Sequence, residues 1–247
     1  MQRRILNSGL ASKKHRTAPS ESLRPRFIFR FLVLVVSAGT ILWSGQGFAL
    51  PNVHEVAQAV DAHYNRLRSL QASFTEIYQG NGISRTESGI LLLKKPGKMR
   101  WEYRSPEEKL FISDGKDAWL YLPNEKQARK SSLKKLEDLR SPLAFLLGKT
   151  KLEKELQGLS FAPDVKAWHE GNSILRGVPR AMEDQVQQVL IEVTPESKIA
   201  RILIDGTDGS LTEYRLSDQT ENVALSDSSF RFLPPAGTEV GDDLNGF

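Results

Sequence analysis

The sequence predicts a mainly β protein in which one N-terminal helix precedes a largely antiparallel sheet. Three observations indicate this class. Apolar residues at helical spacing follow Asn52, a residue type that caps helices well. Most of the chain beyond them consists of short runs rich in β-branched and aromatic residues. The pair Asp114-Gly115 lies between two such runs, "KLFIS" and "AWLYL", and predicts a tight hairpin turn.

The remaining elements follow in chain order. The apolar positions of the helix are Val53, Val56, Ala57, Val60, Tyr64 and Leu67. The first two strands are "LQASFTEIYQ", which ends at Gly80, and "RTESGILLLKK", in which Gly89 indicates a β-bulge. The third is "KKPGKMRWEY", and the hairpin comes next. Strands resume with "VQQVLIEVTP", "IARILIDG" and "LTEYRLS", and end with "FRFLPP", whose prolines stop pairing.

One region departs from the strand pattern. The segment "SSLKKLEDLRSPLAFLLGK" has Ser131 or Ser132 as a helix cap, followed by leucines at helical spacing, Leu133, Leu136 and Leu139. Pro142 then begins a second short helix over residues 143–147, which Gly148 closes. The sequence therefore predicts a hinged pair of helices that interrupts the sheet.

The N-terminus predicts a secretory signal peptide over residues 1–49. The first 30 residues hold eight cations and one acid, Glu21. The apolar run "FLVLVVSAGTILW" follows, and "GFA" has the small-residue spacing of a cleavage site. The alternative is an uncleaved membrane anchor, but a membrane span needs about 20 apolar residues and this run is shorter. We therefore expect cleavage after Ala49 and a single domain over residues 50–247.

Removal of this segment reverses the net charge. The whole chain has 34 Lys and Arg and 30 Asp and Glu, a net charge of +4. Eight of the cations and one of the acids lie in residues 1–49, so 26 and 29 remain and the net charge becomes −3. Proteins that bind nucleic acid concentrate positive charge. We therefore expect no nucleic-acid partner.

The sequence offers no motif for catalysis or for metal binding. It has no cysteine, which excludes disulfides, thiol chemistry and a lipid-modified N-terminus. The histidines at 54, 63 and 169 have no partner at metal-ligand spacing, and no serine lies in a nucleophile elbow. Asp114 and Asp117 flank the hairpin turn, and turn chemistry explains them better than an acid pair does. We expect no enzyme activity, no metal and no cofactor.

The stretch "KKPGKMRWEY" contains the main candidate for a binding surface. In a strand, Met99, Trp101 and Tyr103 share one face, because side chains alternate with a period of two. That face is large, apolar and aromatic, and cations border it. Such a stripe belongs more often to an ordinary core than to a ligand site. The residue pattern leaves both interpretations open.

An ordered series of motifs resembles the periplasmic outer-membrane lipoprotein carrier family, LolA. The series is "GILLLKKPGKMRWEYRSPEEKLFISDGKDAWLYLPNEKQ" at residues 89–127, with "LQASFTE" upstream and "NVALSDSSFRFLPPAGTEV" near the C-terminus. The resemblance implies an incomplete antiparallel β-barrel with a helical lid over an apolar cavity. It also implies a periplasmic monomer that carries the acyl chains of lipoproteins from an inner-membrane ABC exporter to an outer-membrane receptor.

The resemblance also implies which residues form the cavity. The lid would be lined by Leu143, Leu146 and Leu147, and the wall would include Phe74, Met99, Trp101 and Phe111. Where this chain has Lys95, the family typically has an arginine that latches the lid through backbone carbonyls, here near residues 146 and 147. Lysine donates as a flexible point charge without a planar fork. A looser latch and a lid that closes by packing alone both stay open.

Other periplasmic proteins share the implied architecture. A sensor that binds an anti-sigma factor needs a second domain, for which this chain is too short. The outer-membrane receptor of the same pathway carries a lipidated cysteine, which this sequence lacks. The main alternative is therefore a periplasmic carrier of glycolipids or other lipids.

Overall fold

The computed structural model describes residues 52–132 and 151–242, which belong to one compact unit, Ala49–Phe247. The predicted signal peptide and the predicted helices beyond Ser132 lie outside the described residues. Ser131 and Ser132, the predicted helix caps, are the last two residues of a strand.

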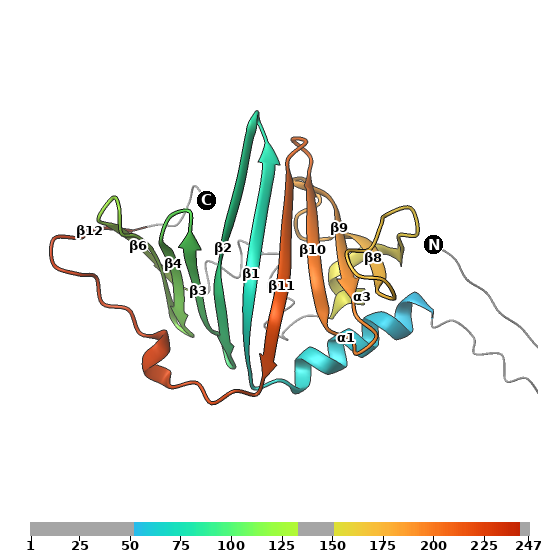
Figure 1. Ribbon diagram of the computed structural model, residues 1–247, viewed down its shortest axis with the longest axis horizontal. Coiled ribbons are helices and arrows are strands. Elements are labelled where there is room, and N and C mark those ends of the chain that lie inside the picture. Colours follow the sequence, from blue (N-terminus) through green and yellow to red (C-terminus); the bar gives the residue numbers. More distant parts are fainter. Residues whose placement is uncertain (1–51, 133–150, 243–247) are drawn as a thin grey trace, which may run out of the picture. The chain divides into compact units, whose positions relative to one another are not determined.

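The described residues form one sheet and three short helical segments (Figure 1). The helical segments are α1 (Val53–Arg66), α3 (Leu152–Glu155) and the 3₁₀ turn η2 (Asp227–Phe230). The first six strands are β1 (Ser69–Gly80), β2 (Ile83–Lys94), β3 (Lys98–Ser105), β4 (Lys109–Asp114), β5 (Asp117–Leu122) and β6 (Gln127–Ser132). The remaining strands are β7 (Leu156–Phe161), β8 (Ser173–Pro179), β9 (Val186–Val193), β10 (Ile199–Gly206), β11 (Leu211–Glu221) and β12 (Glu239–Asp242).

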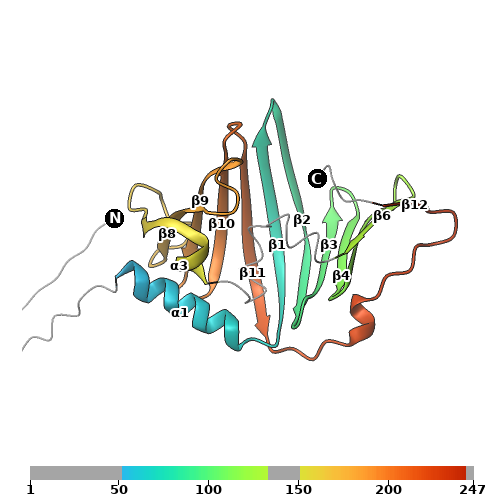
Figure 2. The same ribbon diagram turned by 180° about the vertical axis from the view of Figure 1, so that it is seen from behind.

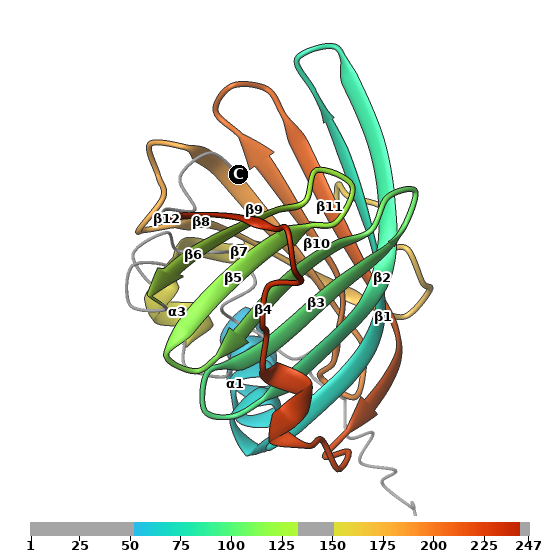
Figure 3. The same cartoon turned by 90° about the vertical axis from the view of Figure 1, so that its left-hand side faces the viewer.

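The sheet is open and almost entirely antiparallel. Its strand order is β12-β6-β5-β4-β3-β2-β1-β11-β10-β9-β8-β7, and β12 with β6 is the parallel pair. Each half is a run of neighbouring hairpins, and the pairing of β1 with β11 joins the two halves. The strands curve around α1, as the side view shows (Figure 3). The predicted class, an incomplete antiparallel barrel, is confirmed.

Two local predictions are confirmed in atomic detail. The Asp114 carboxylate accepts hydrogen bonds from the backbone N–H groups of Lys116 and Asp117, both at 2.8 Å, and closes the β4–β5 hairpin. The pairing of β2 with β3 shifts register at Gly89, as expected for a bulge. A Cβ atom at Gly89 would collide with the backbone carbonyl of Glu102, so the close approach of the two strands requires glycine there.

The prediction of a strand at "FRFLPP" is wrong. Phe230 ends η2, and residues 231–237 form no strand. Phe230 is 1% exposed, so its place in the core explains the apolar pattern without any pairing, and the two prolines have no N–H to give to a ladder. This C-terminal segment passes below the sheet and returns to β6 as β12 (Figures 1 and 2).

Helix α1 begins as the sequence predicts. The Asn52 side chain accepts a hydrogen bond from Glu55 N at 2.9 Å, and the Glu55 carboxylate accepts one from Asn52 N at 3.1 Å. This reciprocal pair satisfies two backbone N–H groups that the helix leaves free. The helix buries one face, formed by Ala57, Val60 and Tyr64.

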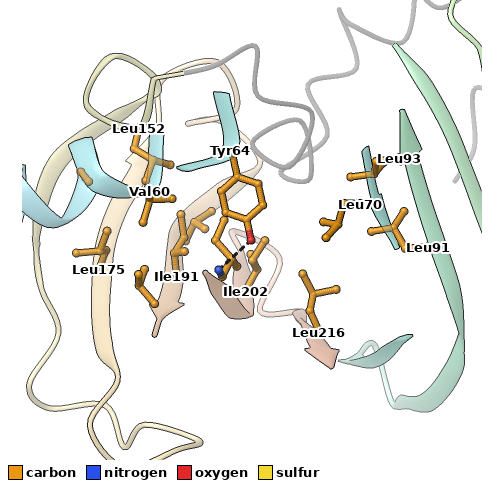
Figure 4. Close-up of a cluster of buried hydrophobic side chains, with 14 of the residues drawn as sticks. Val60, Tyr64, Leu70, Leu91, Leu93, Leu152, Leu175, Ile191, Ile202 and Leu216 are labelled. Carbon is orange, nitrogen blue, oxygen red and sulfur yellow. Dashed lines mark hydrogen bonds between the residues drawn. The ribbon is translucent and has the colours of Figure 1, made fainter. Parts of the chain in front are cut away.

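The main core lies between α1 and one face of the sheet, which we call the inner face (Figure 4). Val60 and Tyr64 of α1 belong to the same cluster as Leu70 of β1, Leu91 of β2 and Ile202 of β10. Both halves of the sheet therefore share one core. Within the described ranges, no helix is long and apolar enough to cross a bilayer.

The Tyr64 hydroxyl anchors α1 to the second half of the sheet. Tyr64 is 2% exposed, and its hydroxyl oxygen accepts a hydrogen bond from Ile199 N at 2.9 Å, drawn as the dashed line in Figure 4. Burial raises the pKa of Tyr64 above its usual value, so the hydroxyl stays neutral.

We predict that Tyr64→Phe destabilises the protein. The substitution keeps the ring but leaves the buried Ile199 N–H without an acceptor, which costs about 1–3 kcal/mol. Urea unfolding followed by circular dichroism measures this change in the free energy of unfolding. Tyr121→Phe, at a partly exposed tyrosine of β5, is the matched control and should unfold like the wild type. Equal stability of both variants would contradict the anchor.

Candidate functional site

The inner face of β1, β3 and β11 carries a cluster of aromatic rings. The ring of Phe74 lies 5.0 Å from that of Trp101 and 4.9 Å from that of Tyr103, measured between centroids. The rings of Trp101 and Tyr214 are 5.8 Å apart. All three contacts are edge-to-face, the geometry that aromatic quadrupoles favour. We call these four residues the aromatic wall.

The predicted wall residues lie together. Phe74 and Trp101 are buried in the main core, and Met99 and Phe111 pack against it partly buried. Trp101 pairs in register with Phe111 of β4, so the apolar surface continues onto the next strand. Met99, Trp101 and Tyr103 all contact this one core, which confirms the predicted common face.

One polar atom of the wall is unusual. The Trp101 indole N–H is buried and has no hydrogen-bond partner among the described residues. A buried donor without an acceptor costs free energy, and such groups are rare in folded proteins. Trp101 is 3% exposed, so any ligand that touches this N–H has to displace the side chains around it.

A cluster of charged residues adjoins the wall. Tyr103 Oη donates to Glu76 Oε2 at 2.6 Å, and Lys109 Nζ lies 2.7 Å from Glu87 Oε1. Arg85 Nε lies 2.7 Å from Glu87 Oε2. We call Glu76, Arg85, Glu87, Lys109 and the Tyr103 hydroxyl the polar cluster. Burial, with the nearby Glu76 carboxylate, raises the pKa of Tyr103, so its hydroxyl remains a donor.

The polar cluster was not predicted from the sequence motifs, although the strand pattern of β2 contains a signal for it. Arg85 and Glu87 have the same strand parity as Leu91 and Leu93 of β2, so they point to the inner face too. A charge pair at inward-facing positions indicates a buried polar site. The alternation runs without a shift along β2, because its pairing with β1 is continuous from Ser69↔Lys94 to Gly80↔Ile83.

Lys95 binds the end of α1. Its ammonium donates to the backbone carbonyls of Tyr64 at 2.6 Å and Asn65 at 3.2 Å. Cations are favoured at the C-terminal end of a helix, where carbonyls are left free. Burial lowers the pKa of Lys95. The predicted contact of Lys95 with the carbonyls near residues 146 and 147 lies outside the described residues and stays a prediction, as do the lid positions Leu143, Leu146 and Leu147.

The neighbouring lysines of the same turn bind the C-terminal segment instead. Lys94 Nζ and Lys98 Nζ lie 2.6 Å and 2.8 Å from the two oxygens of Asp227. These two cations lower the pKa of Asp227 to about 2. The basic rim of "KKPGKMRWEY" therefore has structural partners on both sides of the sheet, α1 through Lys95 and η2 through Asp227.

A separate open hollow of about 380 Å³ lies at the β9–β10 turn, β11 and the loop before β8. Trp168, His169, Glu196 and Lys198 line it. Lys198 pairs with Glu221 at 3.0 Å, and the described part of the chain has no group of three side chains that could hold a metal. None of the predicted site residues lines this hollow, so it is no part of the candidate site.

An open, largely antiparallel sheet whose apolar inner face packs against one helix defines the class of fold. The comparison with known sequences supplies the family. The chain matches "Outer membrane lipoprotein carrier protein LolA" over residues 65–233, more than half of its length, and it belongs to that family. The match begins near the end of α1 and includes every strand from β1 to β11. It therefore covers both the aromatic wall and the polar cluster.

Curated relatives point the same way. The chain is 30% identical over 200 residues to the outer-membrane lipoprotein carrier protein of Dechloromonas aromatica, which covers 78% of this chain and 92% of that protein. It is 28% identical over 217 residues to the protein of the same name from Methylococcus capsulatus. That alignment covers 87% of this chain and 98% of the relative. The outer-membrane lipoprotein carrier protein of Methylobacillus flagellatus is 26% identical over 186 residues. That alignment covers 74% of this chain and 87% of the relative.

We predict that Lys95→Met loosens α1. The two carbonyls lose a charge-assisted donor worth about 1–2 kcal/mol, so the last turn of the helix should open more often. Amide hydrogen exchange over residues 60–67 measures this opening. Lys95→Arg restores donors with a planar fork and should exchange as slowly as the wild type or more slowly.

Lys94→Met is the matched control for this test. It removes the adjacent lysine, whose partners lie in the C-terminal segment, and should leave exchange in α1 unchanged. Wild-type exchange in the Lys95→Met protein would show that this lysine does not hold the helix.

Proposed function

We propose that the protein is a periplasmic carrier that holds the acyl chains of lipoproteins against the aromatic wall. It receives them from an inner-membrane ABC exporter and delivers them to an outer-membrane receptor. The observation that supports this most is the family match over the segment that builds the inner face. The proposal gives the protein no catalytic residue, no cofactor and no metal, and it treats the carrier as a monomer.

The burial of the wall fits the needs of a carrier. Burying one CH₂ group gains about 0.8 kcal/mol, so a fully enclosed 16-carbon chain would gain roughly 12 kcal/mol. A carrier with several chains held so tightly could not pass its cargo on. Phe74 and Trp101 are 2% and 3% exposed, so cargo must first displace the side chains that cover them. The free energy of that displacement reduces the affinity to a level that permits transfer.

The lid of the proposal is the predicted helical pair of residues 131–148, lined by Leu143, Leu146 and Leu147. Asp61 of α1 supports this assignment, because its carboxylate accepts hydrogen bonds from Leu152 N, 3.1 Å from each oxygen. The chain therefore continues from the proposed lid into Leu152, whose backbone N–H is hydrogen-bonded to α1. Burial raises the pKa of Asp61.

A periplasmic carrier of glycolipids or other lipids is the alternative, since an apolar face serves any acyl chain. Mass spectrometry of the ligand that co-purifies from the periplasm distinguishes the two. Acylated protein supports the proposal, whereas a glycolipid supports the alternative.

We predict that the mature chain begins at Leu50. The "GFA" sequence before this residue has the spacing that signal peptidase requires. The intact mass of the protein from the periplasm should match residues 50–247. A membrane-bound species that keeps the run "FLVLVVSAGTILW" would contradict the prediction.

We predict that Met99→Glu folds but no longer carries cargo. Met99 packs only partly buried against the core, so the variant should fold with little change in its circular dichroism. Bound hydrocarbon would face the new carboxylate, at an effective cost of several kcal/mol. Co-purification of an acylated lipoprotein measures cargo binding.

Leu92→Glu is the matched control for this test. Leu92 has the opposite strand parity to Leu91 and Leu93 and pairs in register with Arg100, so its carboxylate lies on the other face of the sheet. This variant should carry cargo as the wild type does. A folded Met99→Glu protein that also carries cargo would remove Met99 from the site, and an unfolded one would make Met99 an ordinary core residue.

A further inference from the structure

The inner face of β1 to β4 changes from apolar to charged along the strands. Strand pairing aligns its side chains in rows. The first two rows are apolar apart from Ser113: Leu70, Leu93, Met99 and Ser113, then Ala72, Leu91, Trp101 and Phe111. The third row is mixed, with Phe74, Gly89, Tyr103 and Lys109. In the fourth, Glu76 pairs with Glu87. The polarity therefore reverses within two rows.

The two carboxylates at the charged end of this face are buried and paired, whereas the Arg85 side chain is 48% exposed. Glu76 and Glu87 are 7% and 4% exposed, so they do not lie at an open rim. Lys109 Nζ is within 2.8 Å of both oxygens of Glu87 and lies 4.3 Å above the ring of Tyr103. Arg85 contacts Glu87 at 2.7 Å and Glu76 at 3.8 Å. Two carboxylates and two cations thus neutralise each other within the polar cluster.

This pairing decides what the cluster can do. Its carboxylates already have donors, so a ligand head group would have to break existing ion pairs to bind. Hydrocarbon placed against it would remove the remaining water from the charges and gain no contact in return. The cluster therefore excludes acyl chains more readily than it binds a polar group.

The apolar length of the face matches one acyl chain. Leu70 to Phe74 is five residues of β1, and the four steps between them measure about 13 Å at about 3.3 Å per residue. The hydrocarbon core of a bilayer is about 30 Å thick, so one leaflet, and hence one lipid chain, occupies about 15 Å. An acyl chain that lies along these strands fills the apolar rows and then meets the polar cluster.

We propose that the polar cluster closes the acyl-binding site and sets the longest chain that the protein accepts. This inference rests on the proposed function, because it assigns a boundary to the site that the carrier would use. Glu87 and Lys109 are the specificity-determining pair, and Tyr103 with Glu76 completes the boundary.

Displacement of 1-anilinonaphthalene-8-sulfonate by saturated fatty acids tests the proposal. Decanoic, myristic, palmitic, stearic and arachidic acid are compared, each below its critical micelle concentration. For the wild type, affinity should rise about fourfold per added methylene, which is the equivalent of about 0.8 kcal/mol, and then stop rising at one chain length. Beyond that length, further methylenes find no apolar surface.

The variant Glu87→Leu/Lys109→Met removes the boundary. It replaces a buried ion pair by apolar side chains of similar size, a change that proteins often tolerate. The rise in affinity should then continue to longer acids. Glu102→Leu/Arg104→Met removes an ion pair of 2.9 Å from the opposite face of neighbouring β3, and this matched control should keep the wild-type limit.

A second variant keeps the test decisive if the double variant does not fold. Glu76→Gln retains an acceptor for the Tyr103 hydroxyl and removes one charge, so it should shift the limit in the same direction by a smaller amount. Affinity that rises without a limit in the wild type, or a limit that both cluster variants share with it, overturns the inference. If no fatty acid displaces the probe from the wild type, the proposed function fails as well.

Discussion

The last turn of α1 contacts two distant parts of the sheet through the backbone and side chain of Tyr64. The hydroxyl of this residue accepts the Ile199 N–H of β10, and its carbonyl accepts the Lys95 ammonium from the turn between β2 and β3. The helix is thereby held to both halves of an open sheet, in which the two edge strands β12 and β7 do not pair with each other. Because the apolar inner face needs a cover, the depth and shape of the core depend on where this turn is held.

The inner face combines a stable core with a surface suited to exchange. Phe74 and Trp101 are buried by edge-to-face ring contacts, while Met99 and Phe111 at its margin are only partly buried. Ring contacts of this kind are each worth about 0.5–1.5 kcal/mol beyond the burial of area. They are weak enough to be replaced by contacts with hydrocarbon. The Trp101 N–H, which has no acceptor among the described residues, lowers the cost of disrupting them further.

The charged residues that adjoin the aromatic wall form three groups with different partners. Lys95 holds α1, whereas Lys94 and Lys98 hold the C-terminal segment through Asp227. The carboxylates of Glu76 and Glu87 in the polar cluster are buried, where an isolated charge would be costly, and the cations paired with them make that burial possible. Neighbouring lysines that look alike in the sequence therefore differ in their binding partners. Each partner lies more than 20 residues away along the chain.

The sequence by itself determined the local features of this protein. The capping box at Asn52, the turn at Asp114, the bulge at Gly89 and the common face of the aromatic residues all depend on neighbours in sequence or on one strand period. Only the tertiary structure decided the rest. "FRFLPP" has the apolar pattern of a strand, but the core takes Phe230 without pairing. The partners of Lys95 and of Glu87 come from other elements, and their choice depends on strand register and helix docking, which no local pattern encodes.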